Sequence, residues 1–419
     1  MPETPGTTAT VDRARLVADL QALVRIPSVT GSEEAVAAWV GDALREVGLA
    51  TDIVRPDPAE IRADPAWPGA EMPRTSLPVV VGRAGTPGGA RLILSGHLDV
   101  VPPGEPTTWT VDPWGGEIRG ERLYGRGAVD MKGGVAAILG AVRALGSSPG
   151  LDALTGELLV VLVPSEEDGG QGTLAAIREL ETADMAIITE PSQLDLVVAH
   201  AGAITFRLTV PGRAAHASHR REGVSALDKL FVLVRALEAD EARRNESETD
   251  PLMRALGLPY ATIIGKVTGG EWASTVLDRI VAEGRYGVRL GQSPEEAADE
   301  LRACIAASCA ADPFLREHPA TVEITGGQFG SARVPVDHGL VTSLTDAARA
   351  VTGRVPRLLG EPYGADMQMF VNVGGIPCVI FGPGDVRVAH SADEWVPLDE
   401  VEACAAVLAT WVSRQIGPR

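Results

Sequence analysis

Three segments in the first half of the chain restrict the fold more than any other feature. Residues 91–101 and 157–163 contain short, nearly continuous runs of Val, Leu and Ile, and residues 129–146 between them carry apolar residues at helical spacing. Strands that are apolar on both faces must be covered on both faces, and the order strand, helix, strand is typical of parallel pairing. The sequence therefore predicts an α/β domain with a mostly parallel central sheet.

Further apolar patterns extend this domain at both ends of the chain. Helices are predicted over residues 11–26 and 32–48, the second with Ser32 as N-cap and Gly48 as C-cap. Residues 376–384 are predicted to form another buried strand, and residues 398–414 a closing helix. The same α/β domain is therefore expected to contain both ends of the chain.

The pattern between these parts is different. It predicts a strand, a helix, two strands, a helix and a strand, over residues 203–212, 225–244, 261–270, 278–290, 294–311 and 320–327. This order is that of a ferredoxin-like unit. We therefore predict an inserted α+β domain at residues 202–328, within a discontinuous α/β domain formed by residues 1–201 and 329–419.

Polar side chains follow the apolar strands where those strands end. They are His97 and Asp99, Asp130 at the entrance to a helix, Glu166 and Glu167, Glu190, and His390. In open α/β sheets, ligands bind in the crevice at the carboxyl ends of the strands. Since side chains alternate along a strand, His97 and Asp99 are expected on the same face, within hydrogen-bonding distance.

So many carboxylates in one crevice would repel one another by several kcal/mol, so cations are expected there. Histidine and carboxylate ligands without cysteine suit zinc, cobalt or manganese better than calcium or magnesium. The four cysteines form no C-x-x-C pair, which argues against a thiolate site. Each motif alone is more often structural, but their joint occurrence favours a metal site.

The balance of charge restricts the partners. The chain has 56 acidic and 37 basic residues, a net charge of -19, which disfavours nucleic acid and anionic membrane surfaces. It has neither an apolar stretch long enough to span a membrane nor the pattern of a signal peptide at its start. We therefore expect a cytoplasmic protein that acts on a small molecule.

Six motifs are distributed along the chain: SGHLDVVP, LYGRGAVDMKGG, SEED, ITEP, PGRAAHAS and AHSADEWV. Together they resemble one known family, the dinuclear zinc aminoacylases, deacylases and carboxypeptidases, which include acetylornithine deacetylase and succinyl-diaminopimelate desuccinylase. The resemblance extends over nearly the whole chain. It implies a zinc-peptidase-like catalytic domain and an inserted domain that serves as lid and dimerisation surface.

The resemblance also implies roles for residues. His97 and His390 would each bind one of two divalent ions, most simply zinc with cobalt or manganese as alternatives, and Asp130 would bridge the ions. Glu167 would ligate one ion and Glu190 the other. Asp99 would orient His97, and Glu166 would act as general base and acid.

In the inserted domain, His216 matches a lid histidine that in dimeric members stabilises the oxyanion in the partner subunit's site. Arg289 matches an arginine that grips a substrate carboxylate. Ser274 or Thr275 stands where many relatives have a substrate-binding asparagine, so the lid departs from the family pattern.

The prediction is a metal-dependent hydrolase of a small N-acyl amino acid, similar to acetylornithine deacetylase, and a homodimer through the lid. A dipeptidase or carboxypeptidase on the same scaffold is the alternative within the enzyme class. A non-catalytic binding protein is the alternative outside it, and it is disfavoured because every expected ligand and the base are present.

Overall fold

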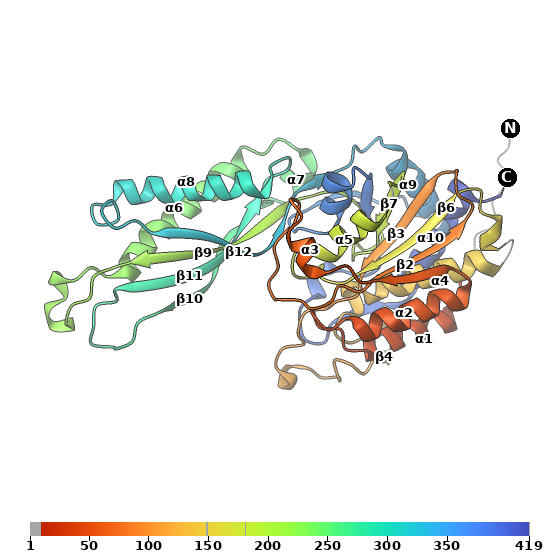
Figure 1. Ribbon diagram of the computed structural model, residues 1–419, viewed down its shortest axis with the longest axis horizontal. Coiled ribbons are helices and arrows are strands. Elements are labelled where there is room, and N and C mark those ends of the chain that lie inside the picture. The colour runs from red at the N-terminus through yellow and green to blue at the C-terminus, as the bar shows by residue number, and fades with distance from the viewer. Residues whose placement is uncertain (1–9, 148–149, 181, 419) are drawn as a thin grey trace.

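The computed structural model describes residues 10–147, 150–180 and 182–418. Two lobes lie side by side (Figure 1), one built on a large sheet and the other on a four-stranded sheet. A small three-stranded sheet, in the order β16-β5-β4, completes the structure (Trp395–Pro397, Arg122–Tyr124 and Glu117–Arg119). Within the described residues, no helix combines the length and the apolar character needed to cross a membrane.

The large sheet has the order β1-β2-β6-β3-β7-β15-β8-β13, with β14 also paired to β8. Its strands are β1 (Ala50–Val54), β2 (Val79–Gly85), β3 (Arg91–His97), β6 (Glu157–Val163), β7 (Met185–Ile188), β8 (Leu196–His200), β13 (Ala332–Arg333), β14 (Leu358–Glu361) and β15 (Cys378–Ile380). The four central strands, β6, β3, β7 and β15, are mutually parallel, whereas β1, β2 and β13 pair antiparallel. The predicted α/β class is confirmed, with a mixed sheet that is parallel at its centre.

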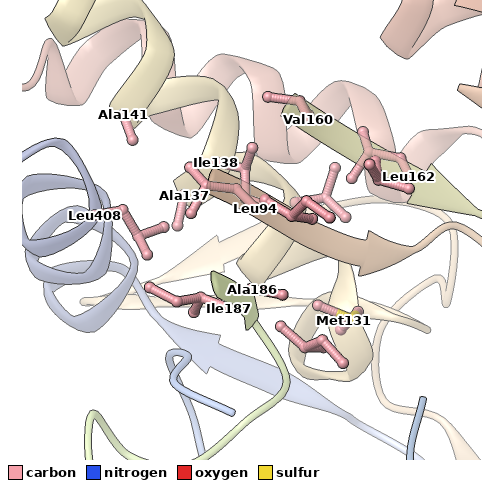
Figure 2. Close-up of a cluster of buried hydrophobic side chains, with 14 of the residues drawn as sticks. Leu94, Met131, Ala137, Ile138, Ala141, Val160, Leu162, Ala186, Ile187 and Leu408 are labelled. Carbon is pink, nitrogen blue, oxygen red and sulfur yellow. The ribbon is translucent and has the colours of Figure 1, made fainter. Parts of the chain in front are cut away.

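Helices cover this sheet and make its core. They are α1 (Arg13–Arg25), α2 (Glu34–Val47), α3 (Pro58–Arg62), α4 (Gly133–Ser147), α5 (Gln171–Glu179), α9 (Gly339–Thr352) and α10 (Leu398–Ile416). Figure 2 shows Ile138 of α4 and Leu408 of α10 beside Leu94 and Ile187 of the central strands. Consecutive residues of β3 and β6 are buried, so both faces of the sheet are covered, as the apolar runs predicted.

The four-stranded sheet has the order β10-β11-β9-β12, and all its pairings are antiparallel. Its elements are β9 (Gly202–Pro211), α6 (Ala226–Glu246), α7 (Pro251–Ala255), β10 (Thr262–Gly269), β11 (Arg279–Val288), α8 (Pro294–Ala311) and β12 (Thr321–Phe329). Residues such as Phe206, Leu233 and Leu301 form a separate core between the sheet and the two long helices. This is the ferredoxin-like order, with the short α7 added. The exact domain boundaries stay a prediction.

Of the two predicted caps of α2, the C-cap is confirmed and the N-cap is wrong. Gly48 ends α2 with a φ of 102°, a left-handed conformation that glycine adopts without strain. The prediction that Ser32 is the N-cap of α2 is wrong. Glu33 takes that position, and its carboxylate turns to the Gly31 N–H and to Arg74, each at 2.8 Å, instead of capping the helix.

Candidate metal centre

The predicted site residues meet at the carboxyl ends of the central parallel strands. His97 is the last residue of β3, Glu166 and Glu167 follow β6, and Glu190 follows β7. The remaining two lie outside the strands: Asp130 lies in the helical turn η2 (Ala128–Lys132) that precedes α4, and His390 lies in the segment after β15. The sheet topology thus brings together residues that lie almost 300 positions apart in the sequence.

Asp130 lies between the two histidines. Its Oδ1 is 3.0 Å from Nε2 of His97, and its Oδ2 is 3.2 Å from Nε2 of His390. Glu190 Oε1 lies 3.3 Å from the same nitrogen of His97, and Glu167 Oε2 lies 3.1 Å from that of His390. Both imidazoles therefore contact Asp130, and each also contacts one glutamate that the other does not.

This donor set fits two divalent ions. Two ligands of one tetrahedral zinc ion lie about 3.4 Å apart, close to the nitrogen to oxygen separations seen here. Among the residues that the structure describes, two groups have donor atoms within 4.8 Å of one another: His97 with Asp130 and Glu167, and His97 with Glu166 and Glu190. Both groups contain His97 and neither contains His390, so these groups alone do not divide the ligands between two ions. A carboxylate with one oxygen toward each imidazole can bridge two ions.

The electrostatics of the cluster also favour cations. Asp130 and Glu167 raise the pKa of His390 to about 10. Burial alone would lower the pKa of His97, but Glu190 and Asp130 outweigh it and raise that pKa well above its ordinary value. Burial raises the pKa of Glu190 to about 7. The carboxylates therefore create a negative potential, which metal ions can neutralise.

Asp99 is placed differently from the expectation. Since β3 ends at His97, Asp99 lies beyond the strand, and the ring Nδ1 of His97 contacts its backbone oxygen at 2.8 Å. The carboxylate is 3.8 Å from that nitrogen. It instead accepts hydrogen bonds from the backbone N–H groups of Glu166 and Glu167, at 3.1 and 3.2 Å. Asp99 thus contacts the imidazole through its main chain and the glutamate loop through its side chain.

Glu166 lies beside this cluster in a cavity of about 280 Å³. The cavity is lined by Glu71, Glu166, Glu167, Asp168, Ala203, Thr205, Arg285, Gly327, Phe329, Tyr363, Gly364 and His390. Burial, with Glu190 nearby, raises the pKa of Glu166 well above its ordinary value. A raised pKa makes the carboxyl a better proton acceptor than an ordinary glutamate, which suits a general base and acid.

Glu394 is a residue of the site that sequence reasoning missed, although it lies in the AHSADEWV motif. Its carboxylate accepts hydrogen bonds from the backbone N–H groups of Val129 and Asp130, at 3.0 and 3.2 Å, and pairs with Arg126. Glu394 and Arg126 are both buried. This pair fixes the loop that presents Asp130.

The predicted lid residues do not reach this cavity within the chain. His216 is exposed, contacts Ser218 Oγ at 2.7 Å, and bridges to Thr275 through the backbone. Ser274 accepts a backbone hydrogen bond from Ala217, so the three predicted residues lie together. The loops after β9 and between β10 and β11 lie at the end of the second lobe away from the large sheet (Figure 1).

Arg289 also lies outside the cavity. Its Nη2 is 3.3 Å from Glu300 of α8, in a cluster that includes Arg243 and Arg244. Arg285, four residues earlier on β11, lines the cavity instead, together with Tyr363. No pattern in the sequence identifies either residue, because the position of each depends on how the two lobes face each other.

Known proteins resemble this chain in sequence. The sequence pattern of peptidase family M20/M25/M40 matches residues 93–414. A succinyl-diaminopimelate desuccinylase of Methylorubrum extorquens strain PA1 is 30% identical over 404 residues, 92% of this chain and 95% of the relative. An N-formyl-4-amino-5-aminomethyl-2-methylpyrimidine deformylase of Halalkalibacterium halodurans is 28% identical over 346 residues, 77% and 78% of the two chains.

Solved structures share the fold. An M20 family metallo-carboxypeptidase from Sulfolobus solfataricus superposes with a TM-score of 0.74 at 17% identity, covering 95% of this chain and 98% of that one. Both lobes are therefore part of one shared architecture.

Proposed function

The chain belongs to peptidase family M20/M25/M40, and from this premise we propose that it hydrolyses the amide bond of a small N-acyl amino acid, releasing a carboxylate and a free amino acid. Membership makes it a metal-dependent hydrolase of linear amides. The desuccinylase that the sequence resembles supports an N-acyl amino acid as substrate, and the deformylase supports the cleavage of a small N-acyl amide.

The observation that carries the proposal is the Asp130 carboxylate between two imidazoles, with a buried Glu166 beside it. We assign His97 and Glu190 to one divalent ion and His390 and Glu167 to the other, with Asp130 shared. Zinc suits these donors best, and cobalt or manganese could replace it. Bound ions would polarise the amide carbonyl and make a water more acidic.

Glu166 is the proposed proton carrier. In the ionised form its carboxylate takes a proton from the attacking water, and it then delivers this proton to the leaving nitrogen. Asp99 holds the backbone of Glu166 and Glu167, so that both carboxylates keep their places while the proton moves. Closure of the small cavity around Glu166 would exclude bulk water.

The first test is primary-amine release by zinc-loaded protein from N-acetyl, N-succinyl and N-formyl amino acids and from dipeptides, with and without a chelator. We expect chelator-sensitive turnover on N-acyl amino acids. The Glu166→Gln variant should keep its metal content and lose at least about 100-fold in turnover. A Gln variant with wild-type turnover, or wild-type turnover on dipeptides alone, would contradict the proposal.

We also propose a homodimer through the second lobe, in which His216 stabilises the oxyanion in the partner's site. The supporting observations are that His216 is exposed and far from the cavity of its own chain, and that apolar side chains are exposed on the same lobe. Phe231 of α6 is 58% exposed and Ile263 of the edge strand β10 is 61% exposed.

Mixed dimers test this arrangement. Glu166→Gln and His216→Ala homodimers should both be nearly inactive, whereas mixing and refolding them should restore activity, because one site of the hybrid receives an intact Glu166 and the partner's intact His216. No recovery in verified hybrids would show that His216 acts within its own chain. An active monomer in sedimentation would exclude the dimer as a requirement.

A further inference from the structure

Arg285 is a positively charged side chain in an otherwise acidic cavity. It projects from β11 of the four-stranded sheet into the cavity that contains Glu166, Glu167 and His390. Its Nη2 donates a hydrogen bond to the backbone oxygen of Pro362 at 3.1 Å. Arg285 forms no ion pair with any residue that the structure describes, although carboxylates line the same cavity.

Two of the acids that line the cavity already have partners. Asp168 pairs with Arg74, and Glu71 accepts a hydrogen bond from the Gly327 N–H at 3.1 Å. Burial lowers the pKa of Arg285, and no neighbouring anion offsets this effect. A half-buried guanidinium without a counter-ion costs free energy in the folded state, a cost that an anionic ligand would remove.

Tyr363 supplies a second free donor next to Arg285. Its hydroxyl oxygen is buried and has no hydrogen-bond partner among the residues described, and its side chain lines the same cavity. Tyr363 directly follows Pro362, whose carbonyl receives the Arg285 hydrogen bond. Buried polar groups in native proteins nearly always have partners, so an unpartnered hydroxyl facing a cavity points to a ligand.

We propose that Arg285 and Tyr363 together bind a carboxylate group of the substrate and so determine its specificity. A guanidinium presents two parallel N–H donors that match the two oxygens of a carboxylate, and a phenol adds a third. The proposal deepens the proposed function, since it rests on amide hydrolysis at the neighbouring Glu166. The carboxylate belongs either to the acyl group, as in a succinyl amide, or to the amino acid.

This assignment differs from the one that the sequence motif favours. Arg289 aligns with the family's carboxylate-binding arginine, but its guanidinium is held by Glu300 on the helix side of the sheet. Arg285 lies in β11 opposite Thr205 of β9, and both residues line the cavity. The side chain that faces Glu166 is therefore that of Arg285.

Three substrates distinguish the possible carboxylates: N-succinyl-leucine, N-butanoyl-leucine without the acyl carboxylate, and N-succinyl-isopentylamine without the amino acid carboxylate. The enzymes compared are the wild type, Arg285→Gln, Arg285→Lys and Tyr363→Phe. The control is Arg207→Gln, which removes a half-buried arginine of the same sheet that pairs with Glu283 outside the cavity. Melting temperatures check that each variant is folded.

For the wild type, deleting the recognised carboxylate should lower kcat/KM by about 10- to 100-fold. Arg285→Gln should lose a similar factor on the intact substrate and show no further loss on the deleted one, which is the signature of a direct interaction. Tyr363→Phe should lose a smaller part of the preference, and Arg285→Lys should lie between Gln and the wild type. Arg207→Gln should keep the full preference.

A wild type without carboxylate preference, or an Arg285→Gln variant that keeps the preference, would overturn the proposal. The proposal would also be overturned if Arg289→Gln abolished the carboxylate preference and Arg285→Gln retained it. If the wild type hydrolyses none of the amides, the proposed function fails, and calorimetry with succinate and leucine still tests the site. Binding that Arg285→Gln weakens would then support the carboxylate site, whereas equal or absent binding would refute it.

Discussion

Replacing Glu394 by Ala tests whether the loop that presents Asp130 is held by one buried ion pair. The Glu394 carboxylate accepts hydrogen bonds from the Val129 and Asp130 N–H groups and faces Arg126. Both members of the ion pair are almost fully buried. Removal of the carboxylate would leave a buried guanidinium and two backbone donors without their acceptor.

The expected cost follows from these contacts. Breaking a buried ion pair by removing one partner typically costs about 3–5 kcal/mol, because the remaining charge stays buried. The two freed N–H groups would each add about 1 kcal/mol if no water replaced the carboxylate. Since such terms overlap, we expect a decrease of about 3–5 kcal/mol in the free energy of unfolding of Glu394→Ala. Displacement of Asp130 should also weaken metal binding by about 10- to 100-fold.

Guanidinium-induced unfolding and zinc titration of the same preparations measure the two effects. The control is Glu402→Ala, which breaks the more exposed pair with Arg13 and should cost less than about 1 kcal/mol. The double variant Arg126→Met with Glu394→Ala should recover part of the lost stability, because it no longer buries a lone charge. If Glu394→Ala costs no more than the control, or binds zinc as the wild type does, the positioning role is refuted.

Three further predictions concern other parts of the structure. Gly134→Ala places a Cβ about 2.0 Å from the Thr189 carbonyl oxygen, so it should lower the free energy of unfolding by about 1–3 kcal/mol in denaturant titrations, although alanine favours a helix. Burial alone would raise the pKa of Asp195, but the N–H of Arg357 and two guanidinium groups lower it. Asp195→Asn should therefore destabilise at pH 7, and the difference should shrink as the pH falls below the ordinary carboxyl value of 3.8. A chelator should lower the melting temperature and zinc should restore it, since ions neutralise the clustered carboxylates; an unchanged melting temperature would contradict a bound metal.

The α/β architecture and the meeting of the site residues could be predicted because both depend on local patterns. Apolar runs identify β3 and β6, and a residue at the carboxyl end of a parallel strand lies near the ends of its neighbours. His97, Glu166 and Glu190 needed no further information to be placed in one crevice. The ferredoxin-like unit was predictable for the same reason, since its hydrophobic periodicity changes with each element.

The contacts of Arg285 and Tyr363 could not be predicted. Arg285 lies in a strand whose side chains point alternately to the two faces of the sheet. A polar residue on the face away from the helices is expected to be exposed to solvent. Its position in the cavity results from the placement of the second lobe against the large sheet. The motif favours Arg289, but its guanidinium pairs with Glu300. Glu300 lies eleven positions later in the sequence, on a helix, and the pattern of the strand does not indicate this contact.

Asp99 and Glu394 are buried carboxylates that support the site through the main chain. Neither faces an imidazole nitrogen at hydrogen-bonding distance through its side chain; each instead accepts two consecutive backbone N–H groups, of Glu166 and Glu167 in one case and of Val129 and Asp130 in the other. Both carboxylates thus gain stabilising contacts from peptide dipoles, although burial outweighs these contacts for Glu394 and raises its pKa to about 7. Because these bonds act on the main chain, they hold the backbone of Glu167 and of Asp130 in place, and two of the proposed metal ligands are thereby positioned.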